Sequence, residues 1–298
     1  MRQHDGRNMR AGLREASAGA RDSLRTEVTR AKVEPLMEIH DMKASDEYFV
    51  GTCTHTNESE EMDSCASRRL AWLSAMYRDG LRIKVAAFDG QRAGFLHVIP
   101  IEHCPWGPLG HDLLVIPCLY VANKGHGVGK ALLAAAEEEA RRQRRKGIAT
   151  IGYYHDFWFM PASFFEANGF SKCGRAKQGY FDSKSRAAVL WRVFDEHAKA
   201  PLLLKPHYLF KPVPGKVVID LFWNAFCQTS NIEAQRVREV AAEFGDSVVL
   251  NEYSADDRPT LLRHQVARGI FVNGREIGWG YEAPKAGIRE AITQAMRG

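Results

Sequence analysis

Apolar and polar positions along residues 62–194 follow two periods, one typical of helices and one typical of strands. Between 62 and 76 the apolar residues recur at helical spacing, which predicts a helix. Two further helices are predicted at about 127–146 and at 162–167. Runs rich in apolar residues predict strands at 82–88, 93–99, 113–121, 148–154 and 188–194. This order of helices and strands indicates a mixed α/β (α+β) domain.

A second series of elements follows a segment with four prolines. Its apolar runs predict strands and helices, which fall at 216–222 (strand), 233–244 (helix), 248–253 (strand), 269–272 (strand) and 285–296 (helix). The pair Asn273-Gly274 marks a turn into a returning strand. The predicted order is therefore β-α-β-β-β-α.

These patterns divide the chain into four parts. Residues 1–32 are rich in Arg, Gly, Ala and Ser and show little apolar periodicity, so we expect a disordered N-terminal arm. A first domain is expected at 33–197 and a second at 216–298. The prolines between them predict a linker at 198–215.

The segment that joins the 113–121 strand to the following helix has the character of an anion site. Gly125, Gly127 and Gly129 let a ligand approach the backbone closely, because no Cβ intervenes. Free amides at a helix start carry partial positive charge and suit a diphosphate. The first two turns of the predicted helix contain no acidic residue. A P-loop is excluded because Lys130 is followed by alanine, and a dinucleotide fingerprint is excluded because three strands precede this turn.

The same segment resembles the acetyl-CoA signature of the GNAT acyltransferase family, Arg/Gln-x-x-Gly-x-Gly/Ala. Lys124 stands at its first position, and Gly127 and Gly129 are its glycines. The order of elements over about 33–195 also fits the GNAT fold, whose mixed central sheet is splayed to admit the cofactor. Pro117 agrees with such a splay, since its missing N–H indicates a bulge or an open edge.

The resemblance implies that acetyl-CoA is the cosubstrate and that an amine of unknown identity is the acceptor. It places the diphosphate at the backbone amides of 125–130 and the pantetheine along the strand before them. The cofactor-binding residues that it implies are Leu119, Tyr120, Val121, Lys124, Gly125, His126, Gly127, Val128, Gly129 and Lys130.

Acetylation of an amine requires the neutral amine and hence a base. His155 follows the strand after the predicted cofactor helix, where the GNAT fold opens into its substrate cleft, and Asp156 stands beside it. His155 is therefore the candidate base, with capping of a loop as its structural alternative. Many GNAT relatives use a tyrosine to protonate the departing thiolate at the position of Phe165, so Tyr154 becomes the candidate acid here.

Residues 219–230 resemble the active-site strand and turn of thioredoxins, with Cys227-x-x-Ser230 in place of the usual Cys-x-x-Cys. A cysteine at a helix start is expected to be partly exposed and to have a lowered pKa. Ser230 cannot close a disulfide, so Cys227 is either a redox-active single thiol or part of a docking surface. Taken whole, the chain is similar to a group with a GNAT domain followed by a thioredoxin-like, YoaP-like domain.

Composition narrows the choice of partners. The 298-residue chain carries a net charge of +5, part of it in an arginine cluster at a helix end, and we expect no nucleic-acid surface. No apolar run is long enough to cross a membrane, and no secretory signal is visible, so a cytoplasmic protein with reduced cysteines is expected. Cys53, His55 and Cys65 match no structural zinc spacing, so no metal is predicted. The oligomeric state stays open.

Two functions follow from these observations. The first is an acetyl-CoA-dependent N-acetyltransferase. The alternative is a CoA-binding, thiol-sensing module with reduced catalysis, which Phe165 and the unpaired Cys227 suggest.

Overall fold

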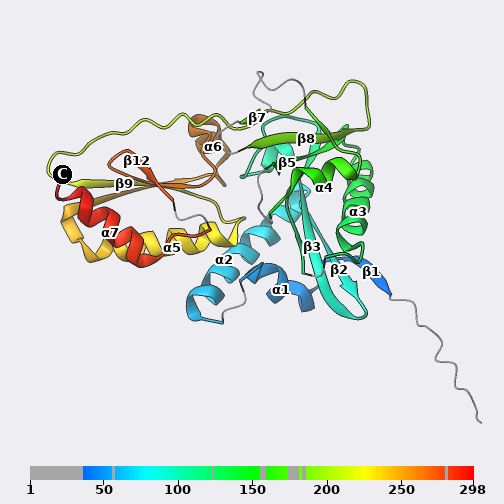
Figure 1. The fold of residues 1–298 in the computed structure, drawn as a ribbon, viewed down its shortest axis with the longest axis horizontal. Coiled ribbons are helices and arrows are strands. Elements are labelled where there is room, and N and C mark those ends of the chain that lie inside the picture. The colour runs from blue at the N-terminus through cyan, green and yellow to red at the C-terminus, as the bar shows by residue number, and fades with distance from the viewer. Residues whose placement is uncertain are drawn as a thin grey trace, which may run out of the picture. The chain divides into compact units, whose positions relative to one another are not determined.

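Two β-sheets organise the part of the chain that the structure, a computed structural model, describes (Figure 1). The described residues are 36–55, 58–122, 124–154, 159–173, 181–182, 186–278 and 281–298. Both sheets belong to one unit, Pro35–Gly298. The arm predicted at 1–32 lies outside the described residues.

The first sheet is mixed and contains eight strands in the order β1-β2-β3-β4-β5-β8-β6, with β7 also paired to β8. Its strands are β1 (Met37–Asp41), β2 (Arg82–Phe88), β3 (Gln91–Pro100), β4 (Leu113–Val121), β5 (Gly147–Tyr153), β6 (Ser171–Lys172), β7 (Phe181–Asp182) and β8 (Ala187–Val193). Only β4 and β5 pair in parallel, and all other neighbours are antiparallel. The mixed α/β fold predicted from the sequence is thereby confirmed.

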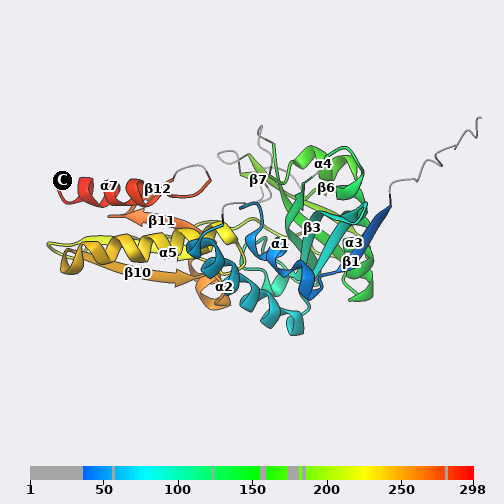
Figure 2. The ribbon, with the colours of Figure 1, turned by 90° about the horizontal axis from the view of Figure 1, so that it is seen from below.

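Four α-helices accompany this sheet: α1 (Glu47–Thr52), α2 (Glu60–Met76), α3 (Val128–Arg142) and α4 (Ala162–Ala167). Leu132 of α3 and Phe165 of α4 are fully buried in one apolar cluster. Val50 of α1 and Leu73 of α2 are fully buried in another cluster. The two pairs of helices therefore cover opposite faces of the sheet (Figure 2). Short 3-10 helices lie at Ala44–Asp46, Tyr77–Asp79, Ile101–His103 and Gly245–Ser247.

The sheet splays between β4 and β5. The two strands pair only from Leu113 to Ile116 on β4, although β5 continues to pair with β8 as far as Tyr153. On the other side of β4, the register with β3 shifts between His97 and Ile99. This irregularity falls opposite Pro117, which cannot donate a ladder hydrogen bond. The bulge expected at this proline is confirmed, and the second half of β4 is left open toward β5.

The second sheet has four strands in the order β10-β9-β11-β12. Its strands and helices are β9 (Val217–Trp223), α5 (Gln228–Glu243), β10 (Val248–Ser254), α6 (Arg258–His264), β11 (Gly269–Val272), β12 (Arg275–Ile277) and α7 (Lys285–Ala295). β10 runs parallel to β9, whereas β11 is antiparallel to β9 and to β12. The structure adds one helix, α6, to the order predicted from the sequence.

Polar contacts tie α5 to α2, and the two helices lie side by side (Figure 2). Arg236 of α5 pairs with Glu61 of α2 at 2.7 Å. The side-chain amide of Gln228, at the start of α5, donates to the backbone carbonyl of Met62. The start of α5 is therefore held against the helices of the first sheet.

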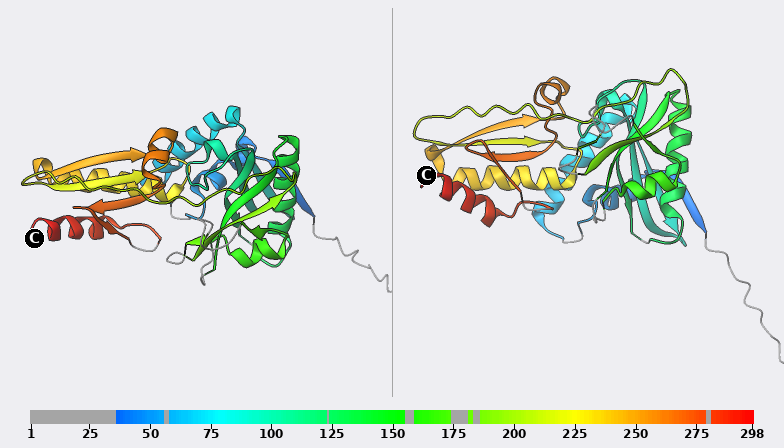
Figure 3. Two further views of the ribbon diagram at one scale, coloured as in Figure 1. Left: turned by 90° about the horizontal axis from the view of Figure 1, so that it is seen from above. Right: turned by 45° about the horizontal axis from the view of Figure 1, so that its top comes forward.

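The segment predicted as a linker is folded against its neighbours rather than loose. Leu202 and Leu109 exchange backbone hydrogen bonds of 2.8 Å. The hydroxyl of Tyr208 donates to Asp220 of β9 at 2.7 Å, and the segment runs along the second sheet (Figure 3). Within the described part of the chain, no helix combines the length and the apolar character that a membrane crossing requires.

Candidate functional site

A cleft of about 340 Å³ opens where β4 leaves β5 and α3 begins. Nine of the ten residues predicted to bind the cofactor line it: Leu119, Tyr120, Val121, Lys124, Gly125, Gly127, Val128, Gly129 and Lys130. The tenth, His126, packs its ring beside Phe88 at 5.0 Å instead. Met160, Pro161 and Phe164 complete the opposite wall.

The start of α3 presents free backbone donors to this cleft. Gly127 is the N-cap, with a φ of 77°, and no side chain caps the helix. A Cβ at Gly125 or Gly127 would meet no atom within 4 Å, so the space beside the backbone is open. The first turn contains no acidic residue, and both Lys124 and Lys130 are exposed beside it. The helix start is thus a positively polarised surface suited to an anion.

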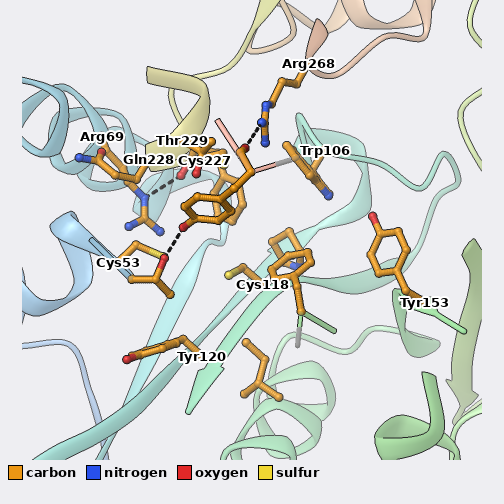
Figure 4. A pocket seen from close by; sticks show the side chains of 16 residues that line it. Cys53, Arg69, Trp106, Cys118, Tyr120, Tyr153, Cys227, Gln228, Thr229 and Arg268 are labelled. Atoms are coloured by element: carbon orange, nitrogen blue, oxygen red, sulfur yellow. Dashed lines mark hydrogen bonds between the residues drawn. The ribbon is translucent and has the colours of Figure 1, made fainter. Parts of the chain in front are cut away.

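A second cavity, of about 230 Å³, lies between β4 and the start of α5 (Figure 4). It collects residues from many separate stretches of the chain. They are Cys53 and Thr54 after α1, Arg69 of α2, Trp106, Pro117 to Tyr120 of β4, Tyr153 and Phe159, Phe226 to Thr229, Arg268, and Tyr281. Among the residues that the structure describes, this lining contains two arginines and no carboxylate. We refer to it below as the cysteine cavity, after Cys53, Cys118 and Cys227.

The cysteine cavity and the cleft meet at β4. Leu119 and Tyr120 line both of them. The open half of β4 is therefore a shared wall, and a ligand lying along it can present one end to each space.

Arg69 gives the cysteine cavity its charge. Only 1% of this residue is exposed, and its guanidinium donates to the backbone carbonyls of Phe226 (2.7 Å), Val50 and Gly51. It also hydrogen-bonds the ring of His97, whose pKa is held well below its usual value by burial and by Arg69 itself. Among the described residues, no carboxylate pairs with Arg69. A buried positive charge without an anionic partner makes the site attractive to anions.

Cys53 and Cys118 interact within this cavity. A hydrogen bond from the Cys118 thiol lowers the pKa of Cys53, and the charge of Arg69 lowers it further, against the opposing effect of burial. The same partnership, together with burial, raises the pKa of Cys118. Of these two thiols, Cys53 is therefore the one whose ionisation the surroundings favour, and it belongs to the loop after α1.

The prediction for Cys227 is correct in position and wrong in pKa. Cys227 is the N-cap of α5 and is half-buried, as expected from the sequence. Burial raises the pKa of its thiol and outweighs the lowering effects of Arg268 and of the Ser230 backbone amide. The Ser230 hydroxyl accepts from the backbone amide of Asn224 at 3.0 Å.

Of the two predicted catalytic residues, Tyr154 lies within the described structure. His155 and Asp156 lie outside the described residues. Tyr154 donates to Glu166 at 2.5 Å, and its pKa is raised by burial and by that carboxylate. Its side chain lines neither the cleft nor the cysteine cavity. Phe165 is fully buried in the apolar core.

Sequence reasoning missed Arg69 and treated Cys53 only as a possible metal ligand. One signal for Arg69 was present in the sequence. It falls on the face of α2 that buries Met62, Cys65 and Leu73, where a charged residue is out of place. No local pattern marks Cys53, whose partners come from distant segments. Within the described ranges, no cluster of three or more His, Cys, Asp or Glu residues is arranged to hold a metal ion.

Comparisons with known proteins find similarity at the level of structure. No family model and no curated protein matches the chain. One similar solved structure is a protein from Desulfovibrio desulfuricans assigned to the GNAT acetyltransferase family, with 17% identity, 53% of this chain and 99% of that chain covered, and a TM-score of 0.41. Another is the PaiA N-acetyltransferase from Thermoplasma acidophilum in complex with coenzyme A. It is 15% identical, the match covers 53% of this chain and 99% of that chain, and the TM-score is 0.36. A third is the ribosomal-protein-alanine N-acetyltransferase from Brucella melitensis. It is 20% identical, the match covers 52% of this chain and 99% of that chain, and the TM-score is 0.37.

Proposed function

We propose that this protein is an acetyl-CoA-dependent N-acetyltransferase that acts on an amine of a small molecule or a peptide. The observation that carries the proposal is the cleft beside the open half of β4, with the uncapped start of α3 at one end. A free helix start suits the diphosphate of CoA. The unpaired edge of β4 offers peptide groups to the amides of pantetheine, a use of the backbone like strand addition to a sheet edge.

In this proposal the acetyl group lies at Leu119 and Tyr120, and the acceptor enters from the cysteine cavity. The amine attacks the thioester carbonyl, the bond to sulfur breaks, and CoA leaves as a thiolate. The positive charge of Arg69 disfavours an ammonium ion nearby, so it favours the neutral amine that the reaction needs. The described lining is largely apolar and contains no carboxylate, which favours a small acceptor with an apolar body over a polycation.

For proton transfer we retain His155 as the proposed base, because it directly follows Tyr154 at the end of β5. As an acid, Tyr154 is a weaker candidate than His155 is as a base, because the Tyr154 hydroxyl already donates to Glu166. A substitution at His155 that lowers kcat without changing acetyl-CoA affinity is the expected signature of a base.

We further propose that residues 216–298 act as a thioredoxin-like domain with a docking role. The parallel pair β9–β10, followed by antiparallel β11 and β12, supports this interpretation. Phe226, Cys227 and Thr229 from this part of the chain line the proposed acceptor cavity. Their role would be to shape the acceptor site, with the first domain at 33–197 supplying the cofactor cleft.

The charge-reversing substitution Lys130→Glu tests the cofactor site. Lys130 is exposed at the first turn of α3, so the change places a carboxylate beside the expected diphosphate with little cost to folding. We expect acetyl-CoA affinity, measured by titration calorimetry, to fall at least about tenfold, or 1.4 kcal/mol. Lys199→Glu makes the same change in net charge at an exposed position outside both cavities and should bind like the wild type.

Turnover is tested by CoA release across a panel of small amines. Equal affinity of the Lys130→Glu and Lys199→Glu variants would contradict the proposed cofactor site. Tight binding of acetyl-CoA without release of CoA for any amine would contradict the transferase.

A further inference from the structure

The cysteine cavity contains a nucleophile that the proposed amine acetylation does not use. We propose that Cys53 accepts the acetyl group from acetyl-CoA as a thioester and passes it to the acceptor amine. This inference rests on the proposed function, because it requires acetyl-CoA in the cleft along β4.

Position is the first argument. Cys53 lines the same cavity as Leu119 and Tyr120, and these two residues also line the cofactor cleft. Its hydrogen-bond partner Cys118 immediately precedes Leu119 on β4. A thioester bound at Leu119 would therefore lie one residue along β4 from Cys118, whose thiol contacts Cys53.

Charge is the second argument. Arg69 is buried without a carboxylate partner among the described residues, and a buried cation is costly unless an anion accompanies it. The Cys53 thiolate is the anion that the cavity can provide. Arg69 and the Cys118 thiol both stabilise that thiolate, which is the form of cysteine that attacks carbonyl carbons.

Backbone geometry is the third argument. Cys53 ends α1 with a φ of 59° and a ψ of −121°, a conformation that side chains other than glycine rarely adopt. Such residues are held by their surroundings and cluster at functional sites. The next two residues anchor the loop that carries Cys53. Thr54 hydrogen-bonds Tyr281, and His55 contacts Glu282 at 3.0 Å.

The chemistry balances without a further reagent. The Cys53 thiolate attacks the carbonyl carbon, a bond forms between carbon and the Cys53 sulfur, and the bond to the CoA sulfur breaks. CoA leaves as a thiolate. The products are therefore one thioester and one thiolate, as the reactants were. The neutral amine then attacks acetyl-Cys53, the carbon–sulfur bond breaks, the Cys53 thiolate is restored, and the amine proton passes to the CoA thiolate or to solvent.

The test is isotope exchange without any acceptor amine. The full chain is incubated with unlabelled acetyl-CoA and isotopically labelled CoA, and the label in the acetyl-CoA pool is followed by mass spectrometry. A covalent acetyl-enzyme returns its acetyl group to labelled CoA, whereas direct transfer to an amine gives no exchange. We expect exchange in the wild type and a loss of at least about 100-fold, equivalent to 2.7 kcal/mol in the barrier, in Cys53→Ala.

Two variants separate chemistry from folding. Cys53→Ser keeps the shape of the side chain and should bind acetyl-CoA like the wild type while exchanging as slowly as Cys53→Ala. Cys173→Ala removes a buried thiol outside both cavities and should exchange like the wild type. In the wild type, an acetyl group that hydroxylamine removes should map to the peptide containing Cys53.

The outcomes distinguish this inference from the proposed function. Binding of acetyl-CoA without exchange, or exchange that persists in Cys53→Ser, overturns the acetyl-Cys53 step alone. Absence of acetyl-CoA binding overturns the proposed function and this step together.

Discussion

Helices α3 and α5 begin in the same way and differ in what surrounds their first turn. Each follows the end of a strand and a short loop, and neither has a side chain that caps it. At α3 the N-cap is Gly127, which is exposed and faces open space. At α5 the N-cap is Cys227, and the next residues, Gln228 to Asn231, are all buried.

The loop that enters α5 satisfies its amides internally. The backbone amide of Ala225 donates to Asp256, and that of Cys227 donates to the side chain of Asn224. Asn224 in turn donates its own amide to the Ser230 hydroxyl. At α3 the residues that lead into the helix, from Lys124 to Gly127, are exposed, which leaves the donors of the first turn to a ligand.

The difference explains why the expectation for Cys227 was wrong. A helix start stabilises an anion by about 0.3–1 kcal/mol, which is less than one pKa unit. Removing a group from water can change its pKa by several units. Desolvation therefore decides the pKa of Cys227, and the helix dipole favours an anion only where water or a ligand reaches the first turn.

The largest expected effect comes from filling the open space at α3. Gly127→Glu introduces a carboxylate and strains a residue with a φ of 77°. We expect acetyl-CoA affinity by calorimetry to fall at least about 100-fold, or 2.7 kcal/mol. Gly215→Glu is the matched control, since Gly215 has a φ of 71°, equally open space and no place in either cavity. A loss of affinity shared by both variants would show that backbone strain, and not the cleft, is responsible.

A smaller effect is expected from the carboxylate beside the start of α5. Burial raises the pKa of Asp256 to about 6, so its ionised form destabilises the folded state. As pH rises from about 4 to 6, the folded state binds more protons than the unfolded state, and stability falls. Asp256→Asn should therefore raise the free energy of unfolding at pH 7.5 by on the order of 2 kcal/mol, with no gain below about pH 4.

Asp257→Asn is the control for this prediction. Asp257 is exposed, its pKa is lowered by Thr260, and its side chain caps α6. Its substitution should not stabilise the protein at any pH. Urea unfolding at several pH values measures both variants, and a stabilisation of Asp256→Asn that does not change with pH would contradict the titration argument.

The smallest expected effect concerns thiol reactivity at the start of α5. Because the pKa of Cys227 is raised, its alkylation by iodoacetamide should be about tenfold slower at pH 7 than that of an exposed peptide thiol, and it should still rise through pH 9. Cys53 should be labelled first among the cysteines of the cavity. Peptide mass spectrometry measures both rates. Fast labelling of Cys227 that levels off below pH 8 would mean that the helix dipole dominates after all.

The elements of the fold with strong local patterns were predictable, and those without such patterns were not. The start of α3 was found because glycines and an acid-free first turn are adjacent in sequence. β1 was missed because its five residues are only partly buried, and α6 because a seven-residue helix with an early proline has little periodicity. The cysteine cavity was missed because Cys53, Arg69 and Cys227 are brought together only by the packing of α2 against α5.

The wall shared by Leu119 and Tyr120 has a consequence for how such a protein can diversify. The other described residues of the cleft lie on β4, on the loop before α3, on α3 and between Met160 and Phe164, whereas much of the cysteine cavity comes from the loop after α1, from α2 and from the start of α5. Sequence drift in the loop after α1 or around the start of α5 can therefore alter the acceptor without touching the donor. Among the described residues, only Leu119 and Tyr120 line both spaces, so these two positions should be the place where natural changes that suit one substrate impair the use of the other.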